Sequence, residues 1–277
     1  MIYIMTALYC EAQSLIQYYH LTKAEEKKRF QVFLDEKKEI CLTVTGAGSM
    51  AAAVAAASVC TSFGAGEGDF LVNYGTCAGE AAQVGQLFLC NKIVEESTGR
   101  TFYPDMVYQN HFDEKMILTG AKMSDTELSG NILYDMEAAA LYQAGSYFFG
   151  PHQMSFLKVV SDSGNGAGVA KDSVKQLMEM HLESVVDYIA QLCRIQQDRK
   201  RQAAVFAQNG NKIEKLCNDL HCSKVMELSL KQYLKYCMLA DIEYEAVVEA
   251  MYREEKIPCS DKREGKKCLE ELKRRLL

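Results

Sequence analysis

Two acidic residues stand where α/β proteins do chemistry. Glu137 precedes an apolar segment, residues 138–141, that predicts a helix, and Asp162 follows the apolar run 154–160, which predicts a buried strand. Ligands collect at the carboxyl ends of strands in open α/β sheets, so both carboxyl groups are expected in one pocket. One carboxyl group can stay ionised there while the other stays protonated, which suits acid–base catalysis. Taken singly, either residue could equally be a helix cap or a turn residue.

The strands and helices that position these residues are predicted from the pattern of the first 198 residues, in which short apolar strands alternate with helices. Strands are expected at 2–7, 31–34, 40–45, 70–74, 84–94, 116–118 and 155–160, and helices at 11–19, 49–61, 136–148 and 171–194. This alternation predicts an α/β domain with a central mixed, mainly parallel twisted sheet flanked by helices.

After residue 198 the strand signal ends. Helices are expected at 211–220, 223–239, 243–256 and 261–276, with breaks at Asn209-Gly210, Asp241 and Pro258. We therefore predict two domains, residues 1–198 and a small helical appendage of residues 199–277 whose role the sequence leaves open. We expect the appendage to be dispensable for chemistry.

Charge divides the chain in the same way. Residues 199–277 hold 17 Lys and Arg against 13 Asp and Glu, whereas residues 1–198 hold 14 against 24. An acidic first domain argues against a nucleic-acid groove there. The basic clusters of the second part (199–201, 262–263, 266–267 and 273–275) lack interleaved aromatics, so we interpret them as solvated helix faces and expect no nucleic-acid partner.

Composition indicates a cytoplasmic protein without a membrane span. No apolar run reaches the roughly 18 residues that a span needs. The first residues, MIYIMTAL, lack the basic flank and cleavage site of a signal peptide and are expected to form a strand. The 11 cysteines are odd in number and form no C-x-x-C pair, which predicts reduced, mostly buried thiols and neither a disulfide framework nor a metal site.

Two glycine-containing segments each follow a predicted strand. The first, residues 45–51 (TGAGSMA), matches the loose form of a dinucleotide-binding fingerprint. Its required acidic residue is misplaced, since Glu67 and Asp69 precede the next strand rather than close it. We therefore interpret the segment as a tight turn that lets backbone approach a ligand, and expect no cofactor.

The second glycine segment, residues 73–79 (NYGTCAG), is expected to be a loop that offers backbone N–H groups near Gly75 and a hydroxyl at Thr76. Cys77 could suggest thiol catalysis. Because no histidine occupies a comparable loop after a strand, we expect Cys77 to be buried and inert.

Together these segments resemble the nucleoside phosphorylase and nucleosidase superfamily, and most closely its methylthioadenosine/S-adenosylhomocysteine nucleosidases. The resemblance covers residues 1 to about 195 and rests on 7–11, the TGAG turn, the NYGTCAG segment, 103–105 (YPD), 136–140 (MEAAA) and 161–162 (SD). The MEAAA helix start and the SD strand end, in this order and spacing, are its most specific parts.

The resemblance implies roles for individual residues. Glu11 matches the glutamate that activates the attacking water. Glu137 matches the glutamate that binds the ribose hydroxyls, with Met136 packing beside the sugar. Asp162 matches the acid that protonates N7 of the leaving purine, with Ser161 positioning it.

Further substrate contacts are implied by the same match. Thr76, beside Gly75, falls where a serine helps to hold the nucleophilic water. Lys158 falls where the nucleosidases have an arginine, and a lysine keeps the positive charge but loses the planar fork. Met123 falls where those enzymes stack a phenylalanine on the base. Phe102 lies in a loop that reaches across a dimer interface in that family, so we expect a homodimer.

Hydrolysis is favoured over phosphorolysis. Phosphorylases of the superfamily place an arginine just before the second glycine segment and another in the first strand-to-helix loop. Here these positions hold Asn73 and the segment 8–11. Two alternatives stay open: a phosphate-dependent purine nucleoside phosphorylase, and a low-activity nucleoside-binding regulatory protein. The regulatory alternative follows from the short segment 106–135 and the helical appendage, which both depart from the family pattern.

Overall fold

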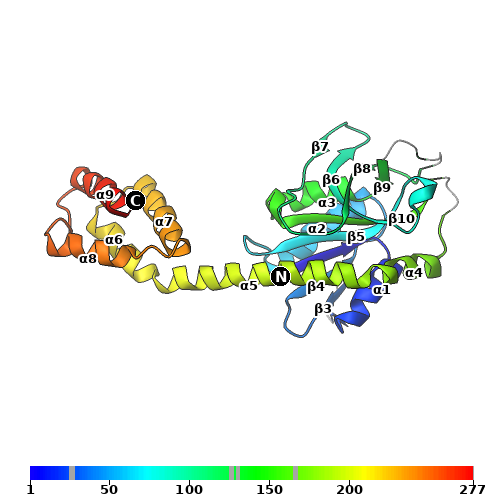
Figure 1. The fold of residues 1–277 in the computed structure, drawn as a ribbon, viewed down its shortest axis with the longest axis horizontal. Coiled ribbons are helices and arrows are strands. Elements are labelled where there is room, and N and C mark those ends of the chain that lie inside the picture. Colours follow the sequence, from blue (N-terminus) through cyan, green and yellow to red (C-terminus); the bar gives the residue numbers. More distant parts are fainter. Residues whose placement is uncertain (25–28, 125–127, 129–131, 165–167, 277) are drawn as a thin grey trace. The chain divides into compact units, whose positions relative to one another are not determined.

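The computed structural model describes residues 1–24, 29–124, 128, 132–164 and 168–276. The chain divides into two compact units, Met1–Gln196 and Gln197–Leu277 (Figure 1). Helix α5 (Leu182–Gln208) contains the division point. Each unit is described by itself.

The first unit contains one mixed sheet. In chain order its strands are β1 (Ile2–Thr6), β2 (Thr22–Lys23), β3 (Gln31–Leu34), β4 (Ile40–Val44), β5 (Phe70–Ala78), β6 (Leu87–Glu95), β7 (Thr101–Phe102), β8 (Asp113–Thr119), β9 (Ile132–Asp135) and β10 (Met154–Asp162). They are ordered β10-β6-β8-β9-β5-β1-β4-β3-β2, with β7 beside β6. Because β10 also pairs with β5, five strands (β5, β10, β6, β8 and β9) close into a ring.

Both pairing directions occur in this sheet. Strand β5 runs parallel to β1 and β10, and β1 runs parallel to β4. Strand β8 runs parallel to β6 and β9. The antiparallel pairings are β2–β3, β3–β4, β6–β7, β10–β6 and a single residue pair between β5 and β9. The carboxyl ends of β1, β5 and β10 therefore point the same way, which is what brings strand-end residues together.

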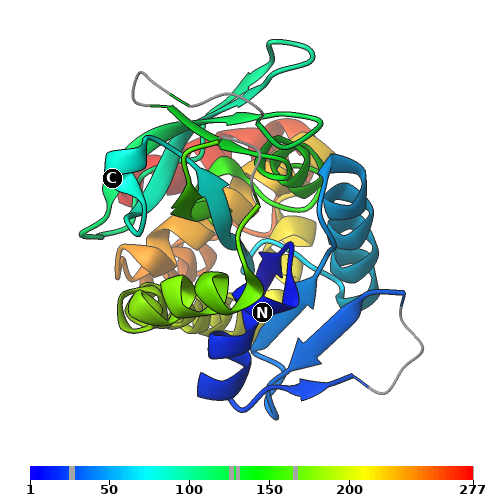
Figure 2. The ribbon, with the colours of Figure 1, turned by 90° about the vertical axis from the view of Figure 1, so that its right-hand side faces the viewer.

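Helices cover both faces of the sheet. They are α1 (Tyr9–Tyr18), α2 (Ser49–Phe63), α3 (Ala138–Gly145) and α4 (Lys171–Met180), together with α5. Helix α1 packs on α4, and α2 packs on α3 (Figure 2). Alternation along β1 separates two cores, since Ile2 and Ile4 join the α1/α4/α5 side and Tyr3 and Met5 join the α2/α3 side.

Several sequence-based expectations were wrong in detail. Residues 75–78 continue β5 rather than forming a loop, so Thr76 and Cys77 lie on a strand. Strands β2, β7 and β9 were not expected, and Phe102, predicted in a loop, is the last residue of β7. The predicted helix 171–194 is two helices, because α4 ends before His181 and α5 begins after it. Part of the short segment 106–135 lies outside the described residues.

The second unit is helical and has its own apolar core. After the end of α5 it contains α6 (Gly210–Asp219), α7 (Lys224–Leu239), α8 (Tyr244–Arg253) and α9 (Lys262–Leu276). Gly265 lets α9 approach the end of α6, since a Cβ at this position would overlap the carbonyl oxygen of Leu220. Among the described residues, no helix has the length and apolar composition needed to span a membrane.

Candidate active site

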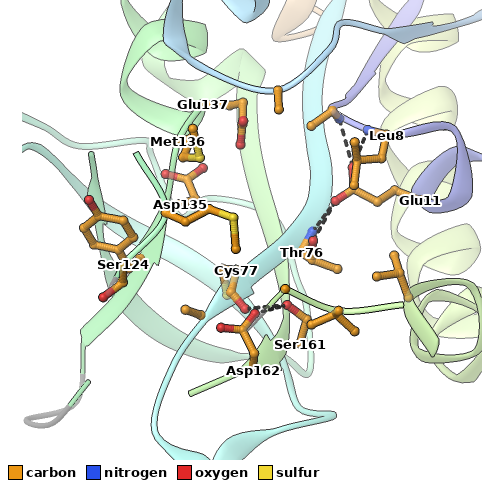
Figure 3. Close-up of a pocket in the computed structure, with 18 residues that line it drawn as sticks. Leu8, Glu11, Thr76, Cys77, Ser124, Asp135, Met136, Glu137, Ser161 and Asp162 are labelled. Carbon is orange, nitrogen blue, oxygen red and sulfur yellow. Dashed lines mark hydrogen bonds between the residues drawn. The ribbon is translucent and has the colours of Figure 1, made fainter. Parts of the chain in front are cut away.

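A cavity of about 300 Å³ lies in the first unit and is lined by residues of α1, β5, β9, β10 and α4 and by the two residues that precede α3 (Figure 3). Glu11, Glu137 and Asp162 all line it. They come from three separate elements, the first turn of α1, the N-cap of α3 and the end of β10. The sheet therefore brings together three acidic residues that lie far apart in the sequence.

Glu11 is the most completely hydrogen-bonded of these acids. Its Oε2 accepts the backbone N–H groups of Ala7 and Leu8, both at 2.9 Å. Its Oε1 accepts the N–H and the hydroxyl of Thr76, both at 2.8 Å. Glu11 occupies the third position of α1, so its side chain reaches back to the N–H of the N-cap residue Leu8 and to that of Ala7 before it. Four donors on a buried carboxyl group satisfy both of its oxygens and fix its orientation.

Gly75 makes room for that carboxyl group. A Cβ at this position would lie 3.2 Å from Oε1 and 3.3 Å from Oε2 of Glu11. These distances are shorter than ordinary van der Waals contacts, and the carboxyl group cannot retreat without losing its donors. The glycine on β5 is therefore required by the close approach of Glu11 to the strand.

Glu137 is held by the first glycine turn. The N–H of Gly48 donates to its Oε1 at 2.7 Å. Gly48 has φ 97°, a backbone conformation that favours glycine, and it is the N-cap of α2. The hydroxyl of Ser49 donates to the carbonyl of Met136 at 2.8 Å, which ties the same turn to the start of α3. The TGAG turn thus binds a protein carboxyl group.

A buried ion pair lies behind Glu137. The ammonium group of Lys158 is 2.7 Å from Oδ2 of Asp135, and the two side chains are 2% and 0% exposed. Asp135 also accepts the hydroxyl of Thr119 at 2.7 Å and the N–H of Ala138 at 2.8 Å. The N–H of Ala139 donates to Thr119 Oγ1 at 3.0 Å. Asp135 and Thr119 therefore satisfy the first free N–H groups of α3 and hold its N-terminus at the cavity.

Burial and this ion pair determine the charge states around Glu137. Burial raises the pKa of Glu137 from its ordinary value of 4.5 to about 7, with the Lys158 ammonium and the Gly48 N–H acting against the increase and Asp135 adding to it. Burial disfavours the ammonium form of Lys158. Asp135 and Glu137 outweigh that effect and hold the pKa of Lys158 above its ordinary value.

Asp162 is oriented by two donors at the end of β10. The hydroxyl of Ser161 donates to Oδ2 at 2.7 Å, and the N–H of Gly164 donates to Oδ1 at 2.8 Å. The same hydroxyl lies 3.2 Å from the carbonyl oxygen of Cys77 on the neighbouring strand. Because β10 pairs in parallel with β5, Ser161 links the two strand ends and fixes the Asp162 carboxyl group at the cavity.

The other residues predicted from sequence divide into two groups. Thr76, Met136, Ser161 and Met123 line the cavity, and Met123 is half-exposed. Gly75, Lys158 and Phe102 do not line it. Gly75 packs behind Glu11 and Lys158 is bound to Asp135. Phe102 stacks on Tyr142 with ring centroids 5.0 Å apart.

Asp135 was missed by the sequence analysis although it lines the cavity. Its signal was present, because it stands two residues before Glu137 and directly before the predicted helix, where an acidic side chain caps free N–H groups. Tyr134 also lines the cavity, and its hydroxyl lies 3.2 Å from Oε2 of Glu96.

The described part of the cavity is lined by acidic, hydroxyl and apolar side chains. Among the described residues, no group of three or more His, Cys, Asp and Glu side chains could hold a metal ion. The described lining residues include no lysine or arginine. Cys77 lines the cavity, but burial raises the pKa of its thiol well above 9.0, so the thiolate that nucleophilic catalysis needs is disfavoured.

Neither a protein-family model nor a curated protein matches this sequence. Solved structures do match. The methylthioadenosine/S-adenosylhomocysteine nucleosidase of Helicobacter pylori, crystallised with butyl-thio-DADMe-Immucillin-A, has a TM-score of 0.57 at 12% identity over 68% of this chain and 97% of that chain. The Neisseria meningitidis nucleosidase of the same name, in complex with methylthio-immucillin-A, has a TM-score of 0.54 at 18% identity over 69% and 97%.

The futalosine hydrolase of Helicobacter pylori matches similarly, with a TM-score of 0.53 at 12% identity over 69% of this chain and 96% of that chain. At these identities the likeness establishes the fold. The resemblance to methylthioadenosine/S-adenosylhomocysteine nucleosidases that the sequence predicted is thus confirmed at the level of the fold.

Proposed function

We propose that the first unit hydrolyses the N-glycosidic bond of a purine nucleoside and releases the base. The observation that carries this proposal is the meeting of Glu11, Glu137 and Asp162 in one cavity whose described wall holds no cation. Breaking this bond leaves a cation-like sugar and an anionic base. Three carboxyl groups in separate environments can protonate the base, stabilise the sugar and activate water.

Asp162 is the proton donor in this proposal. Protonation of N7 makes the purine a neutral leaving group, so the acid must lie at one end of the cavity and keep a fixed orientation. Ser161 and Gly164 supply that orientation from the end of β10. Asp162 gives its proton to N7 as the bond from the base to C1′ breaks.

Glu137 binds and stabilises the sugar. Its Oε1 is occupied by Gly48, which leaves Oε2 for the ribose hydroxyls. The positive charge that develops on the sugar favours the ionised form of Glu137, against the burial that raises its pKa. The interaction is therefore stronger in the transition state than with bound substrate, which is what accelerates a reaction.

Glu11 activates the water together with Thr76. The Thr76 hydroxyl donates to Glu11, so its oxygen can accept a hydrogen bond from a water in the cavity. As the water attacks C1′, its proton passes to this Glu11–Thr76 pair. The products are the free base and a sugar with a hydroxyl at C1′.

A nucleoside without a phosphate group, similar to methylthioadenosine or S-adenosylhomocysteine, is the substrate class we propose. Leu8, Met136, Val169 and Val174 give the cavity apolar walls that suit a purine and the thioether part of a 5′ substituent. The solved structures of similar fold include enzymes named for these substrates. Phosphorolysis fits less well. Asn73 stands where phosphorylases have an arginine, but it is buried and its side-chain amide donates to the carbonyl of Met5 at 3.1 Å, so it is not available to bind a phosphate.

We also propose that residues 1–198 form the catalytic domain, that residues 199–277 form a separate helical domain, and that the catalytic domain works as a homodimer. The first part rests on the position of the three acids, all before residue 163. The homodimer rests on Phe102 in β7, which takes no part in the cavity of its own chain.

A substrate panel tests the function. Methylthioadenosine, S-adenosylhomocysteine, adenosine and inosine are each incubated with the full chain, and base release is measured. We expect release from at least one of them, and a loss on the order of 10²-fold in kcat for Asp162→Asn with a modest change in KM. Binding of a nucleoside without release of base would support a regulatory protein and contradict the proposal, as would a wild-type rate in Asp162→Asn.

A further inference from the structure

Helix α7 of the second unit is apolar on two sides. One side holds Met226, Leu230, Leu234 and Cys237, which are buried in the core of the unit. The other side faces outward and is also apolar. Charged residues lie between these two sides, so the outward apolar face is a separate surface that the core of the unit does not cover.

The outward face is a continuous stripe of five exposed residues, which we call the α7 stripe. Its apolar members are Val225, Leu228, Tyr236 and Leu239, with exposed fractions of 77%, 58%, 52% and 50%. Gln232 lies between them and is exposed. At 100° per residue these side chains fall within an arc of roughly 80° on the helix surface. Four large apolar side chains this exposed on one face of a short helix mark an interaction surface.

The spacing within the α7 stripe is symmetric about Gln232. Leu228 and Tyr236 lie four residues before and after it, and Val225 and Leu239 lie seven before and after. Two copies of α7 packed antiparallel about a two-fold axis at Gln232 would set Val225 against Leu239 and Leu228 against Tyr236. Each apolar side chain then meets another apolar one, which is the self-complementarity that an isologous interface requires.

We propose that the α7 stripe is a self-association surface, on which α7 of a second copy of this chain packs antiparallel with the two Gln232 side chains meeting on the axis. This interface belongs to the helical unit and does not depend on the proposed catalytic function. It joins two helical units.

Charge at the two ends of α7 fits the same arrangement. Lys224 opens the helix, and its side chain is 76% exposed although it also pairs with Glu227. Asp241 and Glu243 follow the C-terminus of α7 and are exposed. Antiparallel packing places Lys224 of each copy beside Asp241 and Glu243 of the other, so opposite charges meet at both ends. The acidic pair at one end of the stripe disfavours an anionic membrane or nucleic acid as the occupant.

The axial residue gives a test that distinguishes this arrangement from any other contact. In a symmetric pair, position 232 faces itself, so Gln232→Glu and Gln232→Lys each set like charges against each other. Sedimentation velocity of the full chain over a concentration series measures the association. We expect the dissociation constant to rise about tenfold or more in either variant. An equimolar mixture of the two variants should regain the wild-type value, because the axis then carries one acid and one base.

Two further variants complete the design. Gln232→Leu should tighten the association, since it completes the apolar stripe. Lys267→Glu changes an exposed charge on α9 and should leave the association unchanged. Because the first unit is itself expected to form a dimer, the reference for each variant is its own mass at the lowest concentration rather than that of a monomer.

The proposal is overturned if wild type, Gln232→Glu and Gln232→Lys sediment alike at every concentration. It is also overturned if both variants dissociate but their mixture does not recover, since position 232 would then meet a different residue. Binding of wild type to vesicles of anionic lipid, abolished by Gln232→Glu, would likewise overturn it, because the α7 stripe would then bind a membrane surface rather than a second copy of the chain. Nucleoside hydrolysis should be unaffected in all of these variants, so failure here leaves the proposed function untouched.

Discussion

The two sides of the cavity hold carboxyl groups of the same kind in opposite environments. Glu11 accepts four hydrogen bonds at 2.8–2.9 Å and lies against Gly75. Glu137 accepts one backbone hydrogen bond, from Gly48. The positive charge that favours its ionised form comes from the more distant Lys158 ammonium. Both are nearly inaccessible to solvent. The two carboxyl groups thus differ in the number of donors that hold them, and burial raises the pKa of Glu137 to about 7.

This difference corresponds to the two roles proposed for the residues. A base that accepts a proton from water must be held in place, which four donors provide. A group that stabilises a transient cation gains most when its ionised form is disfavoured until the cation appears. The same substitution on the two sides should therefore have opposite effects on stability.

Glu11→Gln should have the largest effect. The new amide NH₂ replaces an acceptor, so it faces N–H or O–H donors that lose their partner. Base release should fall on the order of 10³-fold, and the free energy of unfolding should fall by about 1–3 kcal/mol. Steady-state kinetics and urea denaturation measure the two effects. Glu36→Gln, at an exposed position, is the matched control and should change neither.

Glu137→Gln should weaken substrate binding and turnover but stabilise the protein at alkaline pH. Folding raises the pKa of Glu137 from 4.5 to about 7, so its contribution to stability is present below pH 4.5 and is lost as the pH rises through 7. Glutamine keeps the Oε1 acceptor for Gly48 and cannot ionise. At pH 8 the variant should exceed wild type in unfolding free energy by on the order of 2 kcal/mol.

The pH dependence provides the control for that variant. The difference in urea midpoint between Glu137→Gln and wild type should shrink as the pH falls from 8 to 5. A variant less stable than wild type at pH 8 would show that Lys158 fully offsets the effect of burial on the pKa of Glu137. The proposed difference between Glu11 and Glu137 would then be wrong.

Gly75→Ala should have the smallest effect. The added methyl group lies against both oxygens of Glu11 and must displace the carboxyl group by a few tenths of an ångström. We expect base release to fall about tenfold through kcat, with a smaller change in KM, because misplacing a catalytic group costs rate. Gly68→Ala is the matched control, since a Cβ there meets nothing within 4 Å. Equal rates in both variants would show that Glu11 tolerates movement.

Much of the fold could be predicted from local patterns. β1, β3, β4, α2 and the four helices after residue 209 lie within a few residues of their expected positions, because apolar periodicity and turn residues define them locally. Strand β9 was missed because its four residues lie within an irregular segment and pair with β8 and β5, which no local pattern reveals.

The site was partly predictable for the same reason. Glu11, Glu137 and Asp162 stand at element ends that sequence can locate, and the structure brings all three to the cavity. The buried Lys158–Asp135 pair could not be predicted, since it joins the middle of β10 to the end of β9. A lysine within an apolar strand gave a reason to look for a buried acid, but only the arrangement of strands identifies Asp135 as its partner.

The most direct test of the central claim is the identity of the second product. The full chain is incubated with the best nucleoside of the panel, first in phosphate-free buffer and then with phosphate, and both base and sugar products are quantified. We predict equal rates of base release in the two buffers and a free reducing sugar in both. Base release that requires phosphate and yields a sugar 1-phosphate would contradict water as the nucleophile and the role assigned to Glu11.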